Sequence, residues 1–216
     1  PSHEIGNAVC IEVQRGPLTP GERAAKRAID ILFAGTGLIA LLPLLTLVAI
    51  AIKLDSRGPI LFRQRRCGFN GRCFQIFKFR TMTVLEDGPV IAQASLSDQR
   101  ITRVGVWLRR TSIDELPQLL NVLGGSMSLV GPRPHALAHD TQFHKVVRRY
   151  AFRHRVKPGL TGWAQVNGLR GPTPTPTEIE RRVEHDLWYI DNWSLGLDLM
   201  IIARTAVEVF RARNAY

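Results

Sequence analysis

Two acidic residues, Asp114 and Glu115, stand side by side in a chain that has 29 lysines and arginines but only 18 acids. Arg109 and Arg110 lie just before them. A carboxylate at a helix start among arginines stays ionised at neutral pH, so it can act as a nucleophile or bind a divalent cation together with a substrate diphosphate. A structural interpretation competes, because residues 112–115 also fit the S-x-x-E capping box of a helix N-terminus.

A second candidate for anion binding is the segment GPRP at residues 131–134. Each proline fixes its own φ and restricts the residue before it, so Arg133 is displayed from a stiff loop. A planar guanidinium on such a loop suits bidentate phosphate binding. The motif is short, and a purely structural turn is an equally good interpretation.

Residues 58–82 are typical of two strands joined around Asn70-Gly71, a dipeptide that suits the positive φ angles of a tight hairpin turn. On the second strand, the period of two places Lys78 and Arg80 on the same face, where both cations project the same way. Cations on an edge strand also protect against aggregation, so the pattern alone does not decide between the two roles.

Sequence signals of other cofactor and metal sites are missing. There is no Walker A loop, no G-x-G-x-x-G and no Ser-His-Asp motif. The cysteines Cys10, Cys67 and Cys73 lack the close pairs that zinc sites use and predict no disulfide framework. His135 and His139 have helical i, i+4 spacing but lack the glutamate of H-E-x-x-H, so we interpret them as surface or cap residues.

Residues 31–52 contain no charged side chain. This uncharged segment is longer than the roughly 18 residues needed for a membrane helix. A cleaved signal peptide is disfavoured, because it has a shorter apolar region and a small-residue cleavage site. A buried core helix is also disfavoured, because a helix that is apolar on every side needs a larger protein around it. Pro43 near the midpoint predicts a sharp kink. Basic residues flank both ends, and such residues stay on the cytoplasmic side, so a re-entrant helix is favoured over a kinked spanning one.

The 216 residues are the length of one ordinary domain, and 45% of them are hydrophobic, enough for a sizeable core. The net charge of +11 indicates an anionic partner: nucleic acid, a membrane surface or a phosphorylated small molecule. Nucleic acid is disfavoured because it leaves the apolar segment unexplained and no aromatic-basic RNA motif is present.

Helical patterns cover residues 101–110, 112–123, 136–154 and the part of the chain from residue 178 onward, with a short strand near residues 126–131 and loops at 84–99 and 158–176. Trp188, Tyr189 and Trp193 suit either an amphipathic helix at the lipid–water boundary or a core. We therefore predict an α+β fold dominated by helices, with a small sheet.

Five longer motifs occur in the order found in bacterial sugar transferases: KRAIDILFAGTGLIALLPLL, KFRTM, TSIDELPQLLNVLGGSMSLVGPRP, VKPGLTGWAQVNG and DLWYIDNWSLGLDL. From about residue 22 to its end, the chain resembles the monotopic polyprenyl-phosphate phosphoglycosyl transferases. The resemblance implies an enzyme of EC class 2.7.8, which transfers a sugar-1-phosphate from a UDP-sugar to undecaprenyl phosphate and so begins exopolysaccharide synthesis.

The resemblance also implies roles for single residues. Asp114 would be the nucleophile and a ligand of Mg²⁺, forming a phosphosugar intermediate and releasing UMP, and Glu115 would be its acid/base or metal-supporting partner. Arg133 would hold phosphate, and we add Lys78, Arg80 and Arg110 as cations that neutralise the diphosphate. A direct transfer without the covalent step fits the same residues.

The same resemblance implies a division into an N-terminal extension (1–21), a re-entrant membrane helix broken at Pro43 (22–56) and a catalytic domain on the cytoplasmic face of the bacterial inner membrane (57–216). Leu42 precedes the proline where some relatives carry serine, which leaves the turn itself open. Many members of the glucose branch carry additional N-terminal membrane helices, so we expect a short natural form or a fragment. The oligomeric state stays open, with a homo-oligomer as one option.

The stretch NGLRGPT favours UDP-glucose as the donor, because Gly-Arg-Asn is common at this place in the galactose branch. UDP-galactose is the alternative donor. An alternative without catalysis is a membrane-anchored basic scaffold in which Asp114 and Glu115 only cap a helix.

Overall fold

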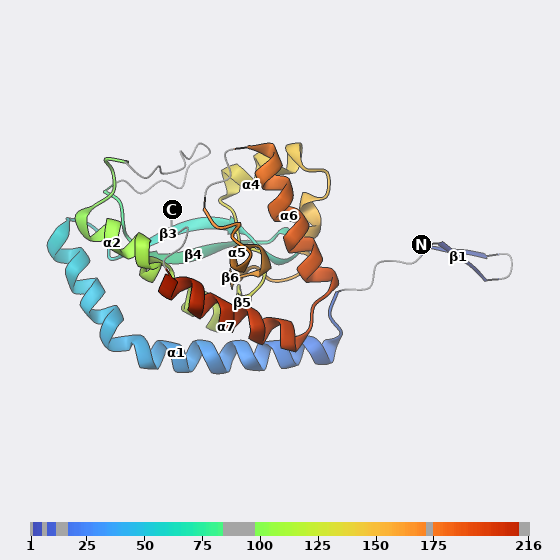
Figure 1. Ribbon diagram of the computed structural model, residues 1–216, viewed down its shortest axis with the longest axis horizontal. Coiled ribbons are helices and arrows are strands. Elements are labelled where there is room, and N and C mark those ends of the chain that lie inside the picture. The colour runs from blue at the N-terminus through green and yellow to red at the C-terminus, as the bar shows by residue number, and fades with distance from the viewer. Residues whose placement is uncertain (1, 6–7, 12–16, 84–97, 172–174, 212–216) are drawn as a thin grey trace.

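Helices make up most of the fold, and short two-stranded sheets and loops accompany them (Figure 1). The computed structural model describes residues 2–5, 8–11, 17–83, 98–171 and 175–211. The α-helices are α1 (Pro20–Asp55), α2 (Arg103–Thr111), α3 (Gln118–Leu123), α4 (Leu137–Val146), α5 (Trp163–Val166), α6 (Pro176–Asp191) and α7 (Leu195–Arg211). The described residues also form the 3₁₀ helices η1 (Phe69–Gly71), η2 (Ile113–Glu115) and η3 (Tyr150–Arg155).

The strands form three separate pairs in the described part of the chain. Strands β1 (Ser2–Ile5) and β2 (Ala8–Ile11) are antiparallel, as are β3 (Leu61–Cys67) and β4 (Cys73–Phe79), while β5 (Ser128–Val130) and β6 (Gly159–Thr161) are parallel. The predicted hairpin is confirmed, and Asn70 and Gly71 have the positive φ angles, 53° and 70°, that its turn requires. The helix-dominated α+β prediction is confirmed to this extent.

Helix α1 begins with a capping box, in which Thr19 and Glu22 satisfy each other's backbone N–H groups, and Pro20 occupies its first turn. It runs along one whole side of the molecule and then changes direction in its C-terminal part (Figure 1). Pro43 lies inside this helix and removes one backbone hydrogen bond, which accounts for the bend.

One stripe of α1 packs on the rest of the protein while most of its apolar surface is open. Of the most apolar 18-residue window, only 11% is buried, and among the described residues α1 alone is long and apolar enough to cross a bilayer. Its large exposed apolar side chains are Ile31, Leu32, Phe33, Ile39, Leu42, Leu47, Ile50 and Leu54. Such a surface is consistent with membrane association, whereas a buried core helix would be covered.

Two predicted helices are each interrupted. The stretch 112–123 divides into η2 and α3 at Leu116 and Pro117, and Ser112, in a left-handed conformation with φ 59°, separates η2 from α2. No side-chain capping bond forms at Ser112, so the capping-box interpretation is wrong. The stretch 136–154 divides into α4 and η3, where the backbone turns extended at Val147 and Tyr150 enters the core.

The other sequence predictions differ from the structure in smaller ways. Helix α2 begins at Arg103, two residues later than predicted, because the Thr102 side chain accepts from the Gly105 N–H and caps it. Most of the predicted loop at 84–99 lies outside the described residues. Of the C-terminal aromatics, Tyr189 is buried in the core, as one interpretation predicts, and Trp188 is exposed, so a position at the lipid–water boundary stays a prediction for that side chain.

Two apolar clusters form the interior. The larger joins α1, α3, α6, α7 and the β5–β6 pair, and its fully buried side chains include Val122, Met127, Tyr150, Ile190 and Ile201. The smaller lies under the C-terminal part of α1, where Val48, Ile52, Phe79 and Leu108 meet. The N-terminal half of α1 is therefore part of the larger apolar cluster as well as of the predicted membrane segment.

A buried carboxylate ties α1 to the sheet. Asp30, 3% exposed, accepts hydrogen bonds from the Leu129 N–H at 2.8 Å and the Ser128 Oγ at 3.0 Å. Both partners are on β5, whose next residues lead into the GPRP loop. Asp30 thereby sets the position of α1 against the strand that carries this loop.

We expect Asp30→Ala to lower the free energy of unfolding by about 1–3 kcal/mol, because it leaves a buried backbone N–H without an acceptor. Urea unfolding of the detergent-solubilised protein, followed by tryptophan fluorescence, measures this. The control is Asp191→Ala, an exposed aspartate at the end of α6, which should stay within about 0.5 kcal/mol of wild type. Equal effects of the two substitutions would contradict the role of Asp30.

Candidate active site

The Glu115 carboxylate is the centre of a buried charge cluster. Lys78 Nζ lies 2.6 Å from its Oε1, and Arg133 donates from both Nη atoms, with Nη1 3.0 Å from Oε2. Glu115 comes from η2, Lys78 from β4 and Arg133 from the loop after β5. Three segments that are far apart in sequence are thus held together by one ionised side chain that is only 8% exposed.

The charges in this cluster depend on one another. Burial raises the pKa of Glu115, but Arg133 and Lys78 outweigh it and hold the pKa well below its usual value. Burial lowers the pKa of Lys78, and the charge of Glu115 opposes that shift. The carboxylate therefore stays ionised, and its two cations are held in a fixed position.

Asp114 lies beside this cluster in a different environment. Burial and the charge of Glu115 raise the pKa of Asp114, against the effect of nearby cations that include Arg109. Within the described part of the chain, no hydrogen bond or ion pair occupies its carboxylate, which is half-buried. An open carboxylate next to a clamped one provides a nucleophile or metal-binding group with a rigid partner.

A cavity of about 310 Å³ adjoins Glu115. Its polar lining includes Ser112, Arg170, Thr161 and Thr205, and its apolar lining includes side chains from α1, β6 and α7. Arg170 donates from Nη2 to the Ser112 Oγ, and burial lowers the pKa of Arg170. Among the described lining residues, Arg170 is the one cation, and Glu115 and Glu208 are acids. A cation beside apolar walls suits a molecule with both an anionic and an uncharged part.

Arg170 is a site residue that the sequence analysis did not predict. It lies in the NGLRGPT stretch, which was used only to choose between donor sugars. That motif is the signal that could have identified it. Its side chain donates to Ser112, which lies 58 positions earlier in the chain. No local sequence pattern encodes a contact over that separation.

The structure places Arg80 away from this site. Its guanidinium donates to the Arg57 and Ser56 carbonyls, the latter at 2.7 Å, and so satisfies the C-terminal end of α1. The side chain is 2% exposed. Strand β4 ends at Phe79, so the strand alternation that put Lys78 and Arg80 on one face does not extend to Arg80.

Arg110 is likewise not brought into the cluster. It is exposed on α2, whereas Arg109, one residue earlier, donates from Nε to Thr81 Oγ1 at 3.0 Å and acts electrostatically on Asp114. Neighbouring residues on a helix point about 100° apart, so only one of the pair can face Asp114. Pro43 shapes α1 and is not part of the cluster.

The loop that carries Arg133 is supported from behind. Arg153 donates from Nη2 to the Arg133 carbonyl at 2.8 Å, and its Nε forms a buried ion pair with Asp186 at 2.7 Å. Gly131 is required where the loop begins, because a Cβ there would lie 2.5 Å from the Lys157 carbonyl oxygen. None of these supports was predicted, because each joins residues that are distant in sequence.

Another group of side chains could hold a metal ion. Asp140, His144 and His154 offer three ligand atoms that all lie within 4.8 Å of one another. None of the three was predicted as a ligand, since the sequence analysis tested only the H-E-x-x-H spacing at His135 and His139.

Comparison with known proteins gives consistent matches. The bacterial sugar transferase family profile matches residues 21–212. The chain is 49% identical over 218 residues to a protein named UDP-glucose:undecaprenyl-phosphate glucose-1-phosphate transferase from Xanthomonas campestris pv. campestris, covering all of this chain and 45% of that one. It is 54% identical over 191 residues to a protein of the same name from Caulobacter vibrioides, covering 88% of this chain and 72% of that one.

A third relative, the exopolysaccharide production protein PSS of Rhizobium leguminosarum bv. phaseoli, is 49% identical over 187 residues, covering 85% of this chain and 94% of that one. The chain spans about half the length of several of the curated relatives that it matches.

We expect Glu115→Gln to lower the free energy of unfolding by about 3–5 kcal/mol, because it leaves the buried Lys78 ammonium without its counter-charge. In the double variant Lys78→Met/Glu115→Gln, much of this loss should be recovered, since no unpaired charge remains at position 78. Urea unfolding of wild type, both single variants and the double variant measures the coupling. Additive losses would show that the pair is not coupled.

Proposed function

Because this chain belongs to the bacterial sugar transferase family, we propose that it transfers glucose-1-phosphate from UDP-glucose to undecaprenyl phosphate, releasing UMP. The names of the Xanthomonas and Caulobacter relatives describe this reaction for those proteins. The observation that carries the proposal is the open Asp114 carboxylate beside Glu115, which Lys78 and Arg133 hold in place.

The donor would bind with its diphosphate toward Arg133 and Arg170 and its sugar or nucleoside in the 310 Å³ cavity. Arg133 has a side chain that is 31% exposed, so part of its guanidinium faces outward from the Glu115 pair. Guanidinium groups suit this task because they present paired donors to phosphate oxygens.

The proposed chemistry proceeds in two displacements. An Asp114 carboxylate oxygen attacks the sugar-side phosphorus of the donor, forming an oxygen–phosphorus bond as the phosphoanhydride bond breaks and UMP leaves with the electron pair. An oxygen of the lipid phosphate then attacks the same phosphorus, and the Asp114 carboxylate leaves. Each step transfers the phosphorus centre from one oxygen to another. Because the donor diphosphate and the lipid phosphate are both anions, dividing the reaction into two steps makes each step easier.

Glu115 positions the cations and keeps its charge throughout, because the pKa of its carboxyl lies well below the usual value. Lys78 and Arg133 offset the negative charge that collects around the phosphorus. Arg109 adds a further cation near Asp114. Arg80, which holds the end of α1, has a structural role in this scheme.

We include Mg²⁺ as the cofactor, with Asp114 as its protein ligand. The residues fit, since Mg²⁺ prefers oxygen ligands, commonly uses one carboxylate with substrate phosphates, and would offset the repulsion between Asp114 and Glu115. When bound, the ion supplies charge neutralisation to the diphosphate.

For its location we propose the cytoplasmic face of the bacterial inner membrane, with α1 as a re-entrant helix. Exposed apolar side chains along α1, the bend at Pro43 and basic residues on both sides of the uncharged segment 31–52 support this. Phe33 of α1 lines the cavity beside Glu115, so the same helix could bring the lipid phosphate close to Asp114.

We predict that Asp114→Asn lowers UMP release by at least about a thousandfold, because the amide cannot act as a nucleophile. The assay uses detergent-solubilised protein with undecaprenyl phosphate, Mg²⁺ and either UDP-glucose or UDP-galactose. Asp191→Asn, an exposed change of the same chemistry, is the matched control and should retain wild-type activity.

The outcomes of this assay are distinct. Release of UMP from UDP-galactose alone would change the donor and keep the reaction class. No release from wild type with either sugar, or full activity of Asp114→Asn, would contradict the proposed transfer and support a non-catalytic scaffold. One UMP per protein in the absence of acceptor, with labelled sugar retained on wild type but not on Asp114→Asn, would distinguish the covalent route from direct transfer.

A labelling experiment tests the topology of α1. In a cysteine-free background, Gly21→Cys and Arg57→Cys place one thiol at each end of the helix, at exposed positions. We expect both thiols to be protected from a membrane-impermeant maleimide in spheroplasts and labelled after lysis, because both ends carry the basic residues that stay in the cytoplasm. Labelling of one end in spheroplasts would instead indicate a spanning helix.

A further inference from the structure

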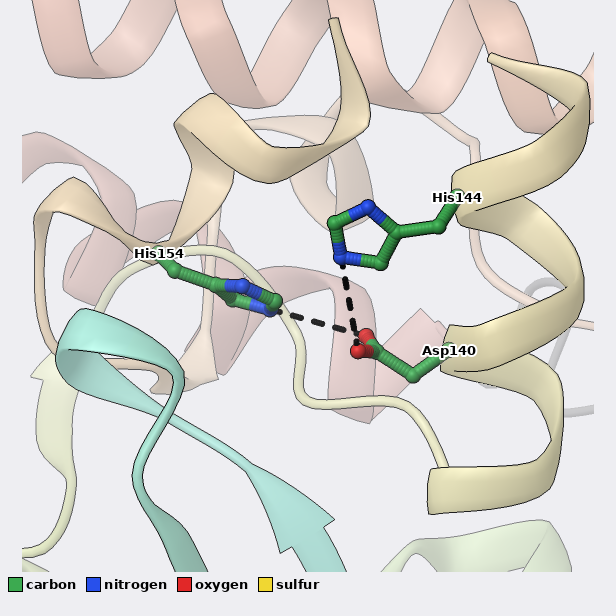
Figure 2. A group of neighbouring side chains, drawn as sticks. All are labelled: Asp140, His144 and His154. Atoms are coloured by element: carbon green, nitrogen blue, oxygen red, sulfur yellow. Dashed lines mark ion pairs between the residues drawn. The ribbon is translucent and has the colours of Figure 1, made fainter. Parts of the chain in front are cut away.

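Three ligand-type side chains converge on the surface behind the Arg133 loop (Figure 2). Asp140 and His144 lie one turn apart on α4, and His154 comes from η3. Both imidazole rings point toward the Asp140 carboxylate, one from α4 and the other from η3 (Figure 2). The ring centroids of the two histidines are 5.8 Å apart.

The distances suit a shared ion better than direct hydrogen bonds. His144 Nε2 lies 3.8 Å from Asp140 Oδ2, and His154 Nε2 lies 3.5 Å from Oδ1, both longer than the 2.7–3.2 Å typical of N–H···O bonds. Two ligands about 2.0–2.1 Å from a tetrahedral ion are roughly 3.3 Å apart. Small side-chain rotations would bring all three atoms to that spacing.

The three side chains differ in their exposure to solvent, as a metal site that is reached from solvent requires. The Asp140 side chain is 6% exposed, His154 is 16% exposed and His144 is 41% exposed. Tyr150 donates a hydrogen bond to Asp140 Oδ1 at 2.7 Å, which orients the carboxylate.

We propose that Asp140, His144 and His154 form a binding site for a zinc-class divalent ion, with solvent in the fourth position. Two imidazoles and one carboxylate are a ligand set for borderline transition metals, whereas Mg²⁺ prefers oxygen ligands alone. This site is separate from Asp114, and it does not depend on the transfer reaction.

The ion would act as a structural clasp. It would join α4 to η3, and η3 supplies Arg153, which holds the Arg133 carbonyl. Tyr150 extends the connection, since its hydroxyl contacts both Asp140 and, at 2.6 Å, the His135 Nδ1. Occupancy of the site would therefore stabilise the segment behind the phosphate-binding loop.

The test is direct binding of Zn²⁺ to tag-free, chelator-treated protein in detergent, by competition with a chromogenic chelator and by thermal unfolding with and without the ion. We expect one ion per chain and a rise of roughly 5 °C in Tm at a hundredfold excess over Kd. His144→Ala and His154→Ala should each weaken binding by at least about tenfold and abolish most of the rise in Tm.

Controls separate this site from other places where Zn²⁺ binds. His139→Ala removes a histidine of the same helix outside the group and should bind as wild type does. Cys67→Ser/Cys73→Ser should also retain binding, because neither cysteine belongs to the group. Unchanged affinity in both histidine variants, loss only in the cysteine variant, or displacement of Zn²⁺ by equimolar Mg²⁺ would each overturn the proposal.

Discussion

The burial of the Glu115 carboxylate between Lys78 and Arg133 is the interaction on which the organisation of this site depends. A carboxylate that is 8% exposed is stable only where opposite charges surround it. That requirement draws β4, η2 and the loop after β5 to one point. Asp114, the preceding residue, then takes its position from a neighbour that two cations hold in place, so a short 3₁₀ helix can fix the position of its carboxylate.

The second layer of the structure maintains Arg133 in turn. The buried Arg153–Asp186 pair connects the loop to α6, and the close approach of Gly131 to the Lys157 carbonyl leaves no room for a side chain. The group formed by Asp140, His144 and His154 lies in the same segment. Paired charges thus connect the core to the loop that carries Arg133. A local change behind this loop can therefore affect the Glu115 cluster in front of it.

Helix α1 has two different surfaces. One stripe is anchored by polar contacts: Asp30 binds β5, and Lys26 forms an ion pair with Asp198 of α7. The opposite surface carries large exposed apolar side chains, and Phe33 also lines the cavity. A helix with both properties can hold the rest of the protein against an apolar phase, which suits the proposed reaction between a water-soluble donor and a lipid acceptor.

The sequence by itself determined the features that depend on near neighbours: the hairpin at Asn70-Gly71, the long apolar helix with its internal proline, and the adjacent acids at positions 114 and 115. The tertiary structure alone decided which cations meet those acids. Lys78 and Arg133 reach Glu115 across 37 and 18 residues, and Arg170 reaches Ser112 across 58. Periodicity describes the face of one element, and it fails where that element ends, as it does for Arg80 just beyond β4.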